Sequence, residues 1–303
     1  MAKLLMKLSE QASWKAYWKD NSGNTFANSY SKNDPLGQII KPYFSTAFEK
    51  MRKHEKILDV GSGMGAHFAF LESSAPQSTV IDSIKGVDFA IEQDITLAKD
   101  RVVYKGDITS LKYPHDSFTS LSAMFAIEYA PVDAALQSIT ACLANAANIA
   151  LLLHRPKSVI CEKSGNTITF YNRLFADGFD ELLIDLPNAV SVKEIEAKLL
   201  KLLLSLNKAL GSQYQHDLSI VANACQAVLV RHAGNKAVCF EKLLKYAEQL
   251  RSHENRLAQQ LAAANNSAAV VSAWESKSAQ VFVNEEVQSE FGLVGHFFHA
   301  QLR

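Results

Sequence analysis

A glycine-rich segment near residue 60 carries residue types that suit the binding of a nucleotide-like ligand. It reads Asp59-Val-Gly61-Ser62-Gly63-Met-Gly65, begins at the end of the apolar run KILDV and precedes the helix-forming stretch AHFAFL. Glycine accepts a positive φ and lets the backbone approach a ligand closely. The first turn of a helix also offers unpaired N–H groups. The segment therefore predicts a tight strand-to-helix turn that binds a ligand.

Asp59 narrows the type of ligand. A carboxylate two residues before the first glycine can accept a hydrogen bond from an ammonium group, and S-adenosylmethionine (SAM) carries one on its methionine part. Gly61, Gly63 and Ala66 also fit the dinucleotide pattern G-x-G-x-x-G/A, in which the helix N-terminus receives a pyrophosphate. In that pattern Asp59 serves no evident purpose. The turn thus favours SAM over NAD, and a turn that binds no ligand is a third interpretation.

Acidic residues end the two strands predicted next along the chain. Asp88 closes KGVDF, where a carboxylate can accept both hydroxyls of a ribose. Asp82 competes for this role, because its distance from Asp59 suits an ordinary β-α-β unit better, but the strand of Asp88 is followed directly by a polar turn. Asp107 closes VVYKGD and can accept an adenine amino group while Ile108 packs on the ring. The alternative for Asp107 is a solvated residue at the start of a loop.

The elements that must position these residues follow from the hydrophobic pattern. Five apolar runs separated by helix-length segments predict parallel strands with crossover helices; they are KILDV, KGVDF, RVVYKGD, SLSAMFA and NIALLLH. Residues 273–303 alternate apolar and polar side chains around Phe291-Gly292, which predicts an antiparallel hairpin. The predicted fold class is α/β, with a doubly wound, mostly parallel seven-stranded sheet, an antiparallel C-terminal strand and a helical insertion.

Helices are predicted before the sheet and within it. Trp14, Tyr17 and Trp18 share one face of a first helix. This face either packs in the core or closes over a pocket. A second helix is predicted at Pro42–Arg52. Three more helices are predicted at 191–210, 213–230 and 237–263. The predicted organisation is a helical lead-in or cap at 1–55, a ligand-binding core at 56–160, a helical insertion at 161–272 as a possible substrate cover, and the hairpin at 273–303.

The composition excludes several classes of protein. Lys and Arg number 31 and Asp and Glu number 31, so the 303-residue chain lacks the basic excess of a nucleic-acid-binding protein. The four cysteines form no CxxC pair, and no cluster of metal ligands is evident. No apolar stretch is long enough to span a membrane, and no signal sequence is recognised. We therefore expect a cytoplasmic protein without metal, membrane or nucleic-acid partner.

The ordered motifs resemble a known family. LDVGSGMG, GVDFA, KGDITSLKYPHDSF and SAMFAIEYAP follow in the order found in class I SAM-dependent methyltransferases of the ubiquinone/menaquinone-methyltransferase-like group, over roughly residues 55–160. The opening SWKAYW is similar to the lead-in of bacterial members. The resemblance implies SAM as cofactor, with the turn on its methionine side, Asp88 on the ribose, Asp107 with Ile108 on the adenine, and Phe125 with Ala126 near the sulfonium.

The chain departs from this family pattern at two places. Glu128-Tyr129 stands where many relatives have Glu-His, and Asn145-Ala-Ala-Asn148 replaces the usual Pro-Gly-Gly before the fifth strand. The first departure removes a catalytic histidine from that position. The second makes the turn before the fifth strand non-standard.

Catalytic candidates lie after strands four and five, where ligands bind in open α/β sheets. They are Glu128, Tyr129 and His154, and His154 is the preferred general base because imidazole titrates near neutrality. A histidine that merely caps its strand is the alternative. Arg155 could bind an acidic substrate or form a salt bridge. A base is required only if the methyl acceptor must lose a proton.

The expected activity is methyl transfer from SAM to an O, N or C atom of a small molecule, with a homodimer formed through the helical insertion as a possible assembly. A methyltransferase acting on tRNA or protein, with the insertion as docking surface, is the first alternative. A non-catalytic SAM-binding protein and a nicotinamide oxidoreductase are the others.

Overall fold

A computed structural model describes residues 10–20, 35–185, 189 and 191–303 of the chain. The chain forms two compact units. The first, called here the helical unit, comprises Met1–Ser13 and Glu162–Ala258. The second, called the sheet unit, comprises Trp14–Cys161 and Gln259–Arg303. Residues 14–20 and 35–55 of the predicted lead-in and residues 259–272 of the predicted insertion therefore belong with the sheet.

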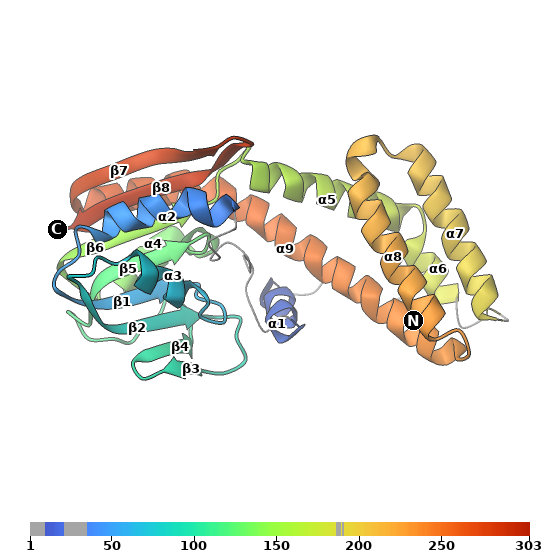
Figure 1. The fold of residues 1–303 in the computed structure, drawn as a ribbon, viewed down its shortest axis with the longest axis horizontal. Helices are drawn as coiled ribbons and strands as arrows, with labels where there is room; N and C mark the ends of the chain where they lie inside the picture. Colours follow the sequence, from blue (N-terminus) through green and yellow to red (C-terminus); the bar gives the residue numbers. More distant parts are fainter. Residues whose placement is uncertain (1–9, 21–34, 186–188, 190) are drawn as a thin grey trace. The chain divides into compact units, whose positions relative to one another are not determined.

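The sheet unit is built on one mixed sheet of eight strands (Figure 1). Five strands are parallel, whereas the two last strands and one short edge strand run antiparallel to their neighbours. In spatial order the strands are β3 (Ile95–Ala98), β4 (Arg101–Lys105), β2 (Val80–Asp88), β1 (His54–Val60), β5 (Phe118–Met124), β6 (Leu143–Leu153), β8 (Gly292–Leu302) and β7 (Ser278–Ser289).

The predicted fold class is confirmed, with one strand more than expected. All five apolar runs form the parallel strands, and the C-terminal hairpin forms β7 and β8. The additional strand is β3, whose four residues pair with β4 at the edge of the sheet. Its sequence, ITLA, is too short to show the alternation that marks a half-buried strand.

Helices cover both faces of the sheet because strand side chains alternate in direction. On one face, Leu58 and Val60 of β1 pack with α4 (Val132–Thr140) and with Val270 and Trp274 near the end of α9 (Lys236–Lys277). On the other face, Ile57 packs with α2 (Pro35–Phe48) and α3 (His67–Ser74). The short 3-10 helix η1 (Ile127–Tyr129) follows β5, and α1 spans Glu10–Asp20.

Helix α2 corrects the predicted position of the second helix. The prediction began the helix at Pro42, whereas α2 begins at Pro35 and contains Pro42 in its interior. An internal proline costs about 3 kcal/mol. The buried face of Ile40, Phe44 and Phe48 offsets that cost, because each fully buried side chain of this size contributes roughly 1.5–3 kcal/mol.

The helical unit has a hydrophobic core of its own. The core is formed by most of α5 (Val159–Ala176), by α6 (Phe179–Asp185), α7 (Val192–Ala209) and α8 (Gln215–Arg231), and by the first part of α9; η3 (Ser212–Tyr214) is a short 3-10 turn. The three predicted helices correspond to α7, α8 and α9. Helix α9 continues to Lys277, beyond its predicted end at 263, because Val270 and Trp274 pack on the sheet.

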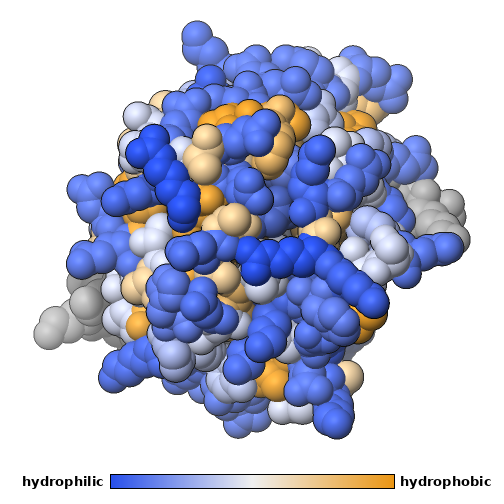
Figure 2. All heavy atoms as spheres, turned by 90° about the vertical axis from the view of Figure 1, so that its left-hand side faces the viewer, coloured by the Kyte–Doolittle hydropathy of each residue, from blue (hydrophilic) through white to orange (hydrophobic). Residues whose placement is uncertain are grey.

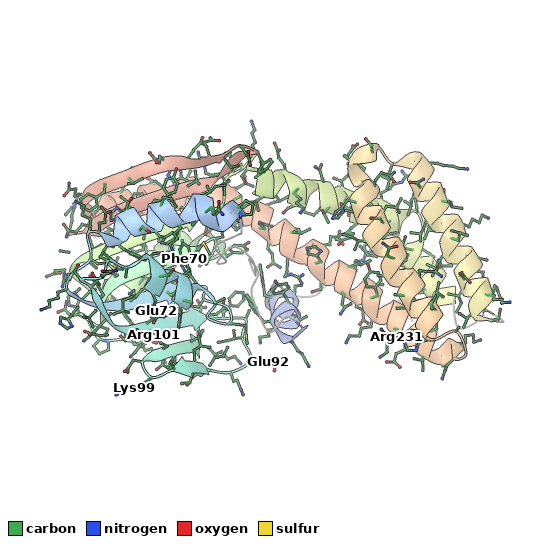
Figure 3. The ribbon with its side chains drawn as sticks, in the orientation of Figure 1. Phe70, Glu72, Glu92, Lys99, Arg101 and Arg231 are labelled. Atoms are coloured by element: carbon green, nitrogen blue, oxygen red, sulfur yellow. The ribbon has the colours of Figure 1, made fainter. Side chains whose placement is uncertain are left out.

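An ion pair connects an outer strand of the sheet to a helix, and one side of the protein surface is largely hydrophilic. Arg101 at the start of β4 forms an ion pair with Glu72 of α3, with 2.7 Å between Nε and Oε1 (Figure 3). The side on which the chain ends after β8 is mostly hydrophilic, with small separate hydrophobic areas (Figure 2). Among the described residues, no helix is both long and apolar enough to cross a membrane.

Candidate functional site

The predicted site residues meet at one edge of the sheet. The glycine turn follows β1, Asp88 ends β2, and Asp107 and Ile108 follow β4. Three further candidates follow β5, namely Phe125, Glu128 and Tyr129, and His154 follows β6. These five strands are parallel, so their carboxyl ends share an edge, and this is where open α/β sheets bind ligands.

The glycine turn has the backbone conformation that its sequence predicts. Gly61, Gly63 and Gly65 have φ values of +69°, +52° and +83°, a region that L-residues rarely adopt. A Cβ at Gly61 would lie 2.2 Å from the Cβ of Ala126 in the segment after β5. Ser62 donates from its hydroxyl to the Asp59 carbonyl oxygen at 2.7 Å, which closes the turn. Glycine is therefore required by both conformation and close packing.

The aromatic face of α1 rests on this turn. A Cβ at Gly63 would lie 2.4 Å from Cη2 of Trp18, so the indole ring lies directly against the backbone. Trp14 stacks on Trp18 at 6.5 Å between ring centroids and meets the edge of Tyr129 at 5.9 Å. The shared helix face predicted from the sequence thus packs between the turn after β1 and the segment after β5.

Asp59 is a buried carboxylate with one oxygen in use. Its side chain is 1% exposed, and Oδ1 lies 2.9 Å from Nδ1 of His67. The ring of His67 is packed between Phe44 and Phe70 at 5.5 and 5.4 Å. Asp59 Oδ2 is buried and has no hydrogen-bond partner among the residues that the structure describes. A buried carboxylate oxygen in this state is costly unless a ligand donates to it.

Asp88 lies beside the glycine turn, whereas Asp82 lies near the other end of the same strand. Asp88 accepts hydrogen bonds from the backbone N–H of Gly63 at 2.9 Å and of Ala90 at 2.8 Å. Burial raises the pKa of Asp88, although these two hydrogen bonds oppose the shift. Asp82 contacts Nδ1 of His54 at 3.1 Å, at the amino-terminal end of the strands. Of the two acids, Asp88 alone is placed to reach a ligand at the turn.

Asp107 and Ile108 begin the loop after β4. Asp107 is exposed, and its Oδ1 accepts from both the backbone N–H and the hydroxyl of Thr109, at 2.8 and 2.7 Å. Ile108 is half-buried and packs against the core. The loop is therefore ordered by its own side chains, and the role predicted for Asp107 and Ile108 stays a prediction.

The catalytic candidates Glu128 and His154 form a buried pair. Glu128 Oε1 accepts from the backbone N–H of His154 at 2.8 Å and lies 2.7 Å from Nδ1 of the imidazole. Both side chains are almost completely buried, at 0% and 2% exposure. The ring of Phe125 lies 4.5 Å from the imidazole, and Phe125 itself has a φ of +53°. A strained non-glycine residue of this kind is frequent at functional sites.

Tyr129 borders the same pair, while Arg155 does not join it. Burial, together with the neighbouring Glu128, raises the pKa of Tyr129 well above its usual value, so its phenol stays protonated at neutral pH. Its ring lies 5.8 Å from that of His154. Arg155 instead forms a salt bridge with Glu286 of β7 at 3.4 Å, which is the second of the two roles that the sequence left open for it.

Three side chains of the site escaped the sequence interpretation. They are His67, which contacts Asp59, and Gln260 and Asn266 of α9. Gln260 Nε2 lies 2.9 Å from His154 Nε2, and Asn266 Nδ2 donates to the backbone oxygen of Glu128 at 3.2 Å. His67 directly follows the glycine turn, so its position was a usable signal. Gln260 lies 106 residues from His154, and no sequence pattern joins them.

Comparisons with known proteins return structures but no sequence family. No family model matches the chain, and no curated protein matches it. A putative SAM-dependent methyltransferase from Methanococcus maripaludis matches with a TM-score of 0.35 and 15% identity, over 48% of this chain and 64% of that one. Geranyl diphosphate C-methyltransferase from Streptomyces coelicolor A3(2) matches with a TM-score of 0.35 and 8% identity, over 48% of this chain and 65% of that one.

A third similar structure is the [4+2]-cyclase SpnF, with a TM-score of 0.36 and 14% identity, over 48% of this chain and 60% of that one. The chain thus spans less than two thirds of the length of each of these three structures. At TM-scores below 0.5, the likenesses carry no argument about function. The functional conclusion has to come from the site itself.

In the part of the chain that the structure describes, no group of three His, Cys, Asp or Glu side chains is placed to hold a metal ion.

Proposed function

We propose that this chain is a SAM-dependent methyltransferase that acts on an O, N or C atom of a small molecule. One observation carries the proposal: the buried Asp59 Oδ2 at the glycine turn has no hydrogen-bond partner among the described residues. A group that donates hydrogen bonds and carries positive charge would satisfy this oxygen best, because charge-assisted hydrogen bonds are the strongest available.

The donor requirement of Asp59 separates SAM from NAD. The ammonium of SAM donates hydrogen bonds and is positive, so it fits a carboxylate. The pyrophosphate of NAD accepts hydrogen bonds and is negative, so a buried carboxylate at the same turn opposes it. The neighbouring Asp88 suits either ligand, since a ribose is common to both. The fit of the site to SAM therefore depends on Asp59.

We infer the remaining cofactor contacts from the residues at the strand ends and from the family resemblance of residues 55–160. Asp88 would hold the ribose hydroxyls, and Asp107 with Ile108 would hold the adenine. Gly61, Ser62, Gly63 and Gly65 would line the methionine part, with Phe125 toward the sulfonium. The motif order over residues 55–160 supports the finer proposal of a ubiquinone/menaquinone-methyltransferase-like enzyme.

The chemistry expected of the chain itself is positioning and proton removal. SAM, when bound, supplies a methyl group on a positively charged sulfur. Holding two reactants in line can contribute about 7–11 kcal/mol to catalysis. His154 would take a proton at Nε2 from a hydroxyl or amine acceptor, and Glu128, bonded to Nδ1, would stabilise the resulting imidazolium. An acceptor that carries no proton would not need this pair.

Calorimetry on two matched variants tests the cofactor assignment. Asp59→Asn removes the charge but keeps the shape, and we expect SAM affinity to fall about 10- to 100-fold, the range for a lost hydrogen bond to a charged group. Asp82→Asn makes the same change near the opposite end of a neighbouring strand and should leave affinity unchanged. Equal affinities in the two variants would refute the role of Asp59.

A turnover assay tests the catalytic part. His154→Gln should bind SAM normally but release S-adenosylhomocysteine about 100-fold more slowly with a hydroxyl or amine acceptor drawn from a metabolite panel. Wild-type rates in this variant would exclude His154 as the base. Wild-type protein that bound NAD instead of SAM would favour an oxidoreductase.

A further inference from the structure

Helix α9 contributes side chains to the Glu128–His154 pair from a distant part of the chain. Gln260 Nε2 lies 2.9 Å from His154 Nε2, so the amide contacts the ring nitrogen that faces away from Glu128. Asn266 donates to the backbone oxygen of Glu128 at 3.2 Å. All four residues belong to the sheet unit. The pair is therefore held from two sides, by its own loops and by α9.

The hydrogen bonds favour Nδ1 as the nitrogen of His154 that carries the proton. Glu128 Oε1 accepts from the backbone N–H of His154 at 2.8 Å. The same oxygen lies 2.7 Å from Nδ1, and a carboxylate at this position accepts a hydrogen from Nδ1. In the neutral ring, Nε2 then has a lone pair and needs a donor. The amide N–H of Gln260 supplies that donor.

The packing of α9 holds Gln260 in place. Ala263, Ala264 and Ser267 are 2%, 1% and 1% exposed, and they lie three, four and seven positions after Gln260, on the same helix face. Small side chains on this face let the helix backbone pack closely against its surroundings. Gln260 can therefore reach His154 from a rigid element rather than from a loop.

We propose that Gln260 is the positioning residue of the transfer reaction. Its amide keeps the lone pair of His154 Nε2 in a fixed direction until the methyl acceptor binds and takes its place. The inference rests on the proposed methyltransferase function. It assigns a role to a residue of α9, an element distant in sequence from the glycine turn.

Every proton and electron pair of the transfer step is accounted for. The acceptor loses a proton to Nε2, the electron pair of that bond becomes available for the new bond to the methyl carbon, and the sulfur keeps the pair of the bond it gives up. His154 is then an imidazolium that must donate from Nε2. A glutamine amide meets this need by rotating, because it presents its oxygen in place of its NH₂. Neither a lysine nor a carboxylate can serve both protonation states.

Nitrogen-15 NMR on the full chain with labelled histidine tests the proposal without activity. His154 is assigned by the signal lost in His154→Gln. We expect a protonated Nδ1 and an unprotonated Nε2 that accepts a hydrogen bond. Gln260→Leu should shift the Nε2 resonance toward that of a non-bonded imidazole, and Gln259→Leu, the same change one residue earlier, should not.

A second variant reverses the polarity of the contact. Gln260→Glu keeps the length of the side chain but can only accept when ionised, so both ring nitrogens of His154 should carry protons in it. This variant keeps the test valid if Gln260→Leu fails to fold. In methyl transfer, we expect Gln260→Leu to lower kcat about 10-fold with an unchanged KM for SAM, the range for one lost hydrogen bond.

The outcomes separate the two proposals. An Nε2 resonance that is the same in wild type and Gln260→Leu, or a wild-type ring protonated at Nε2 alone, would overturn the role of Gln260 even if SAM binds. The expected resonances in a protein that fails to bind SAM would overturn the methyltransferase function and with it the positioning role. The expected resonances, normal SAM binding and a lowered kcat together would support the inference.

Discussion

Replacing Gly61 by alanine should destabilise the sheet unit strongly. Gly61 has a φ of +69°, and a left-handed backbone costs an alanine about 1–2 kcal/mol. The new methyl group would also lie 2.2 Å from the Cβ of Ala126. Both atoms are attached directly to the backbone, so neither can rotate away. Relieving such overpacking costs about 1–3 kcal/mol, and the total expected loss is about 2–5 kcal/mol.

Replacing Gly165 by alanine should have the opposite effect on the free energy of unfolding. Gly165 lies inside α5, and a Cβ there would meet no atom within 4 Å. Alanine is favoured over glycine inside a helix by about 0.5–1 kcal/mol, so this variant should be slightly more stable.

Urea unfolding followed by circular dichroism compares the two variants, because Gly165 lies in the helical unit and Gly61 in the sheet unit. Tryptophan fluorescence adds a probe of the sheet unit alone. Trp14, Trp18 and Trp274 all lie in the sheet unit, so their fluorescence reports on the unit that contains Gly61. The free-energy change follows from the shift in midpoint at constant m-value. A Gly61→Ala protein as stable as wild type, within 0.5 kcal/mol, would show that the turn does not have this conformation, and cofactor binding could not be argued from it.

Two further predictions concern a buried histidine and the aromatic face of α1. Burial, aided by the positive Lys50, lowers the pKa of His299 from 6.5 to about 4, so the unfolded chain binds a proton between those values and the folded protein does not. Stability should therefore fall as the pH falls through this window, by about 2 kcal/mol at pH 5 relative to pH 7.5. The variant His299→Gln lacks the titrating ring, so its free energy of unfolding should fall less over the same pH range. An equal pH dependence of the unfolding free energy in the two proteins, measured by urea titration, would contradict the assignment. SAM should change the tryptophan fluorescence because Trp18 rests on Gly63; Trp18→Phe should lose most of this change, and its full retention would show that α1 is not at the site.

Much of the framework could be predicted because the decisive signals are local. The run KILDV followed by three glycines indicates a strand and a turn whatever the rest of the chain does. Asp88 and His154 could be placed because each follows a buried apolar run, and the end of such a run in a parallel sheet is a ligand-facing position. Sequence separation alone left Asp82 as a rival to Asp88, and only the observed length of β2 separates them.

The remaining parts depend on packing between distant segments. Pro42 misplaced the start of α2 because a local rule about proline competes with the burial of Phe44 and Phe48. The contact of Gln260 with His154 depends on how α9 crosses the sheet, and glutamine itself carries no local signal of such a role. Side chains that act on a catalytic pair from another element are therefore the part of a site that a single sequence conveys least.

Titration of the wild-type chain with SAM and with NAD in a calorimeter shows whether the turn around Gly61 binds SAM through Asp59. We expect saturable binding of SAM at one site per chain, lost or strongly weakened in Asp59→Asn, and no measurable binding of NAD. Binding of NAD with no heat from SAM would contradict this expectation.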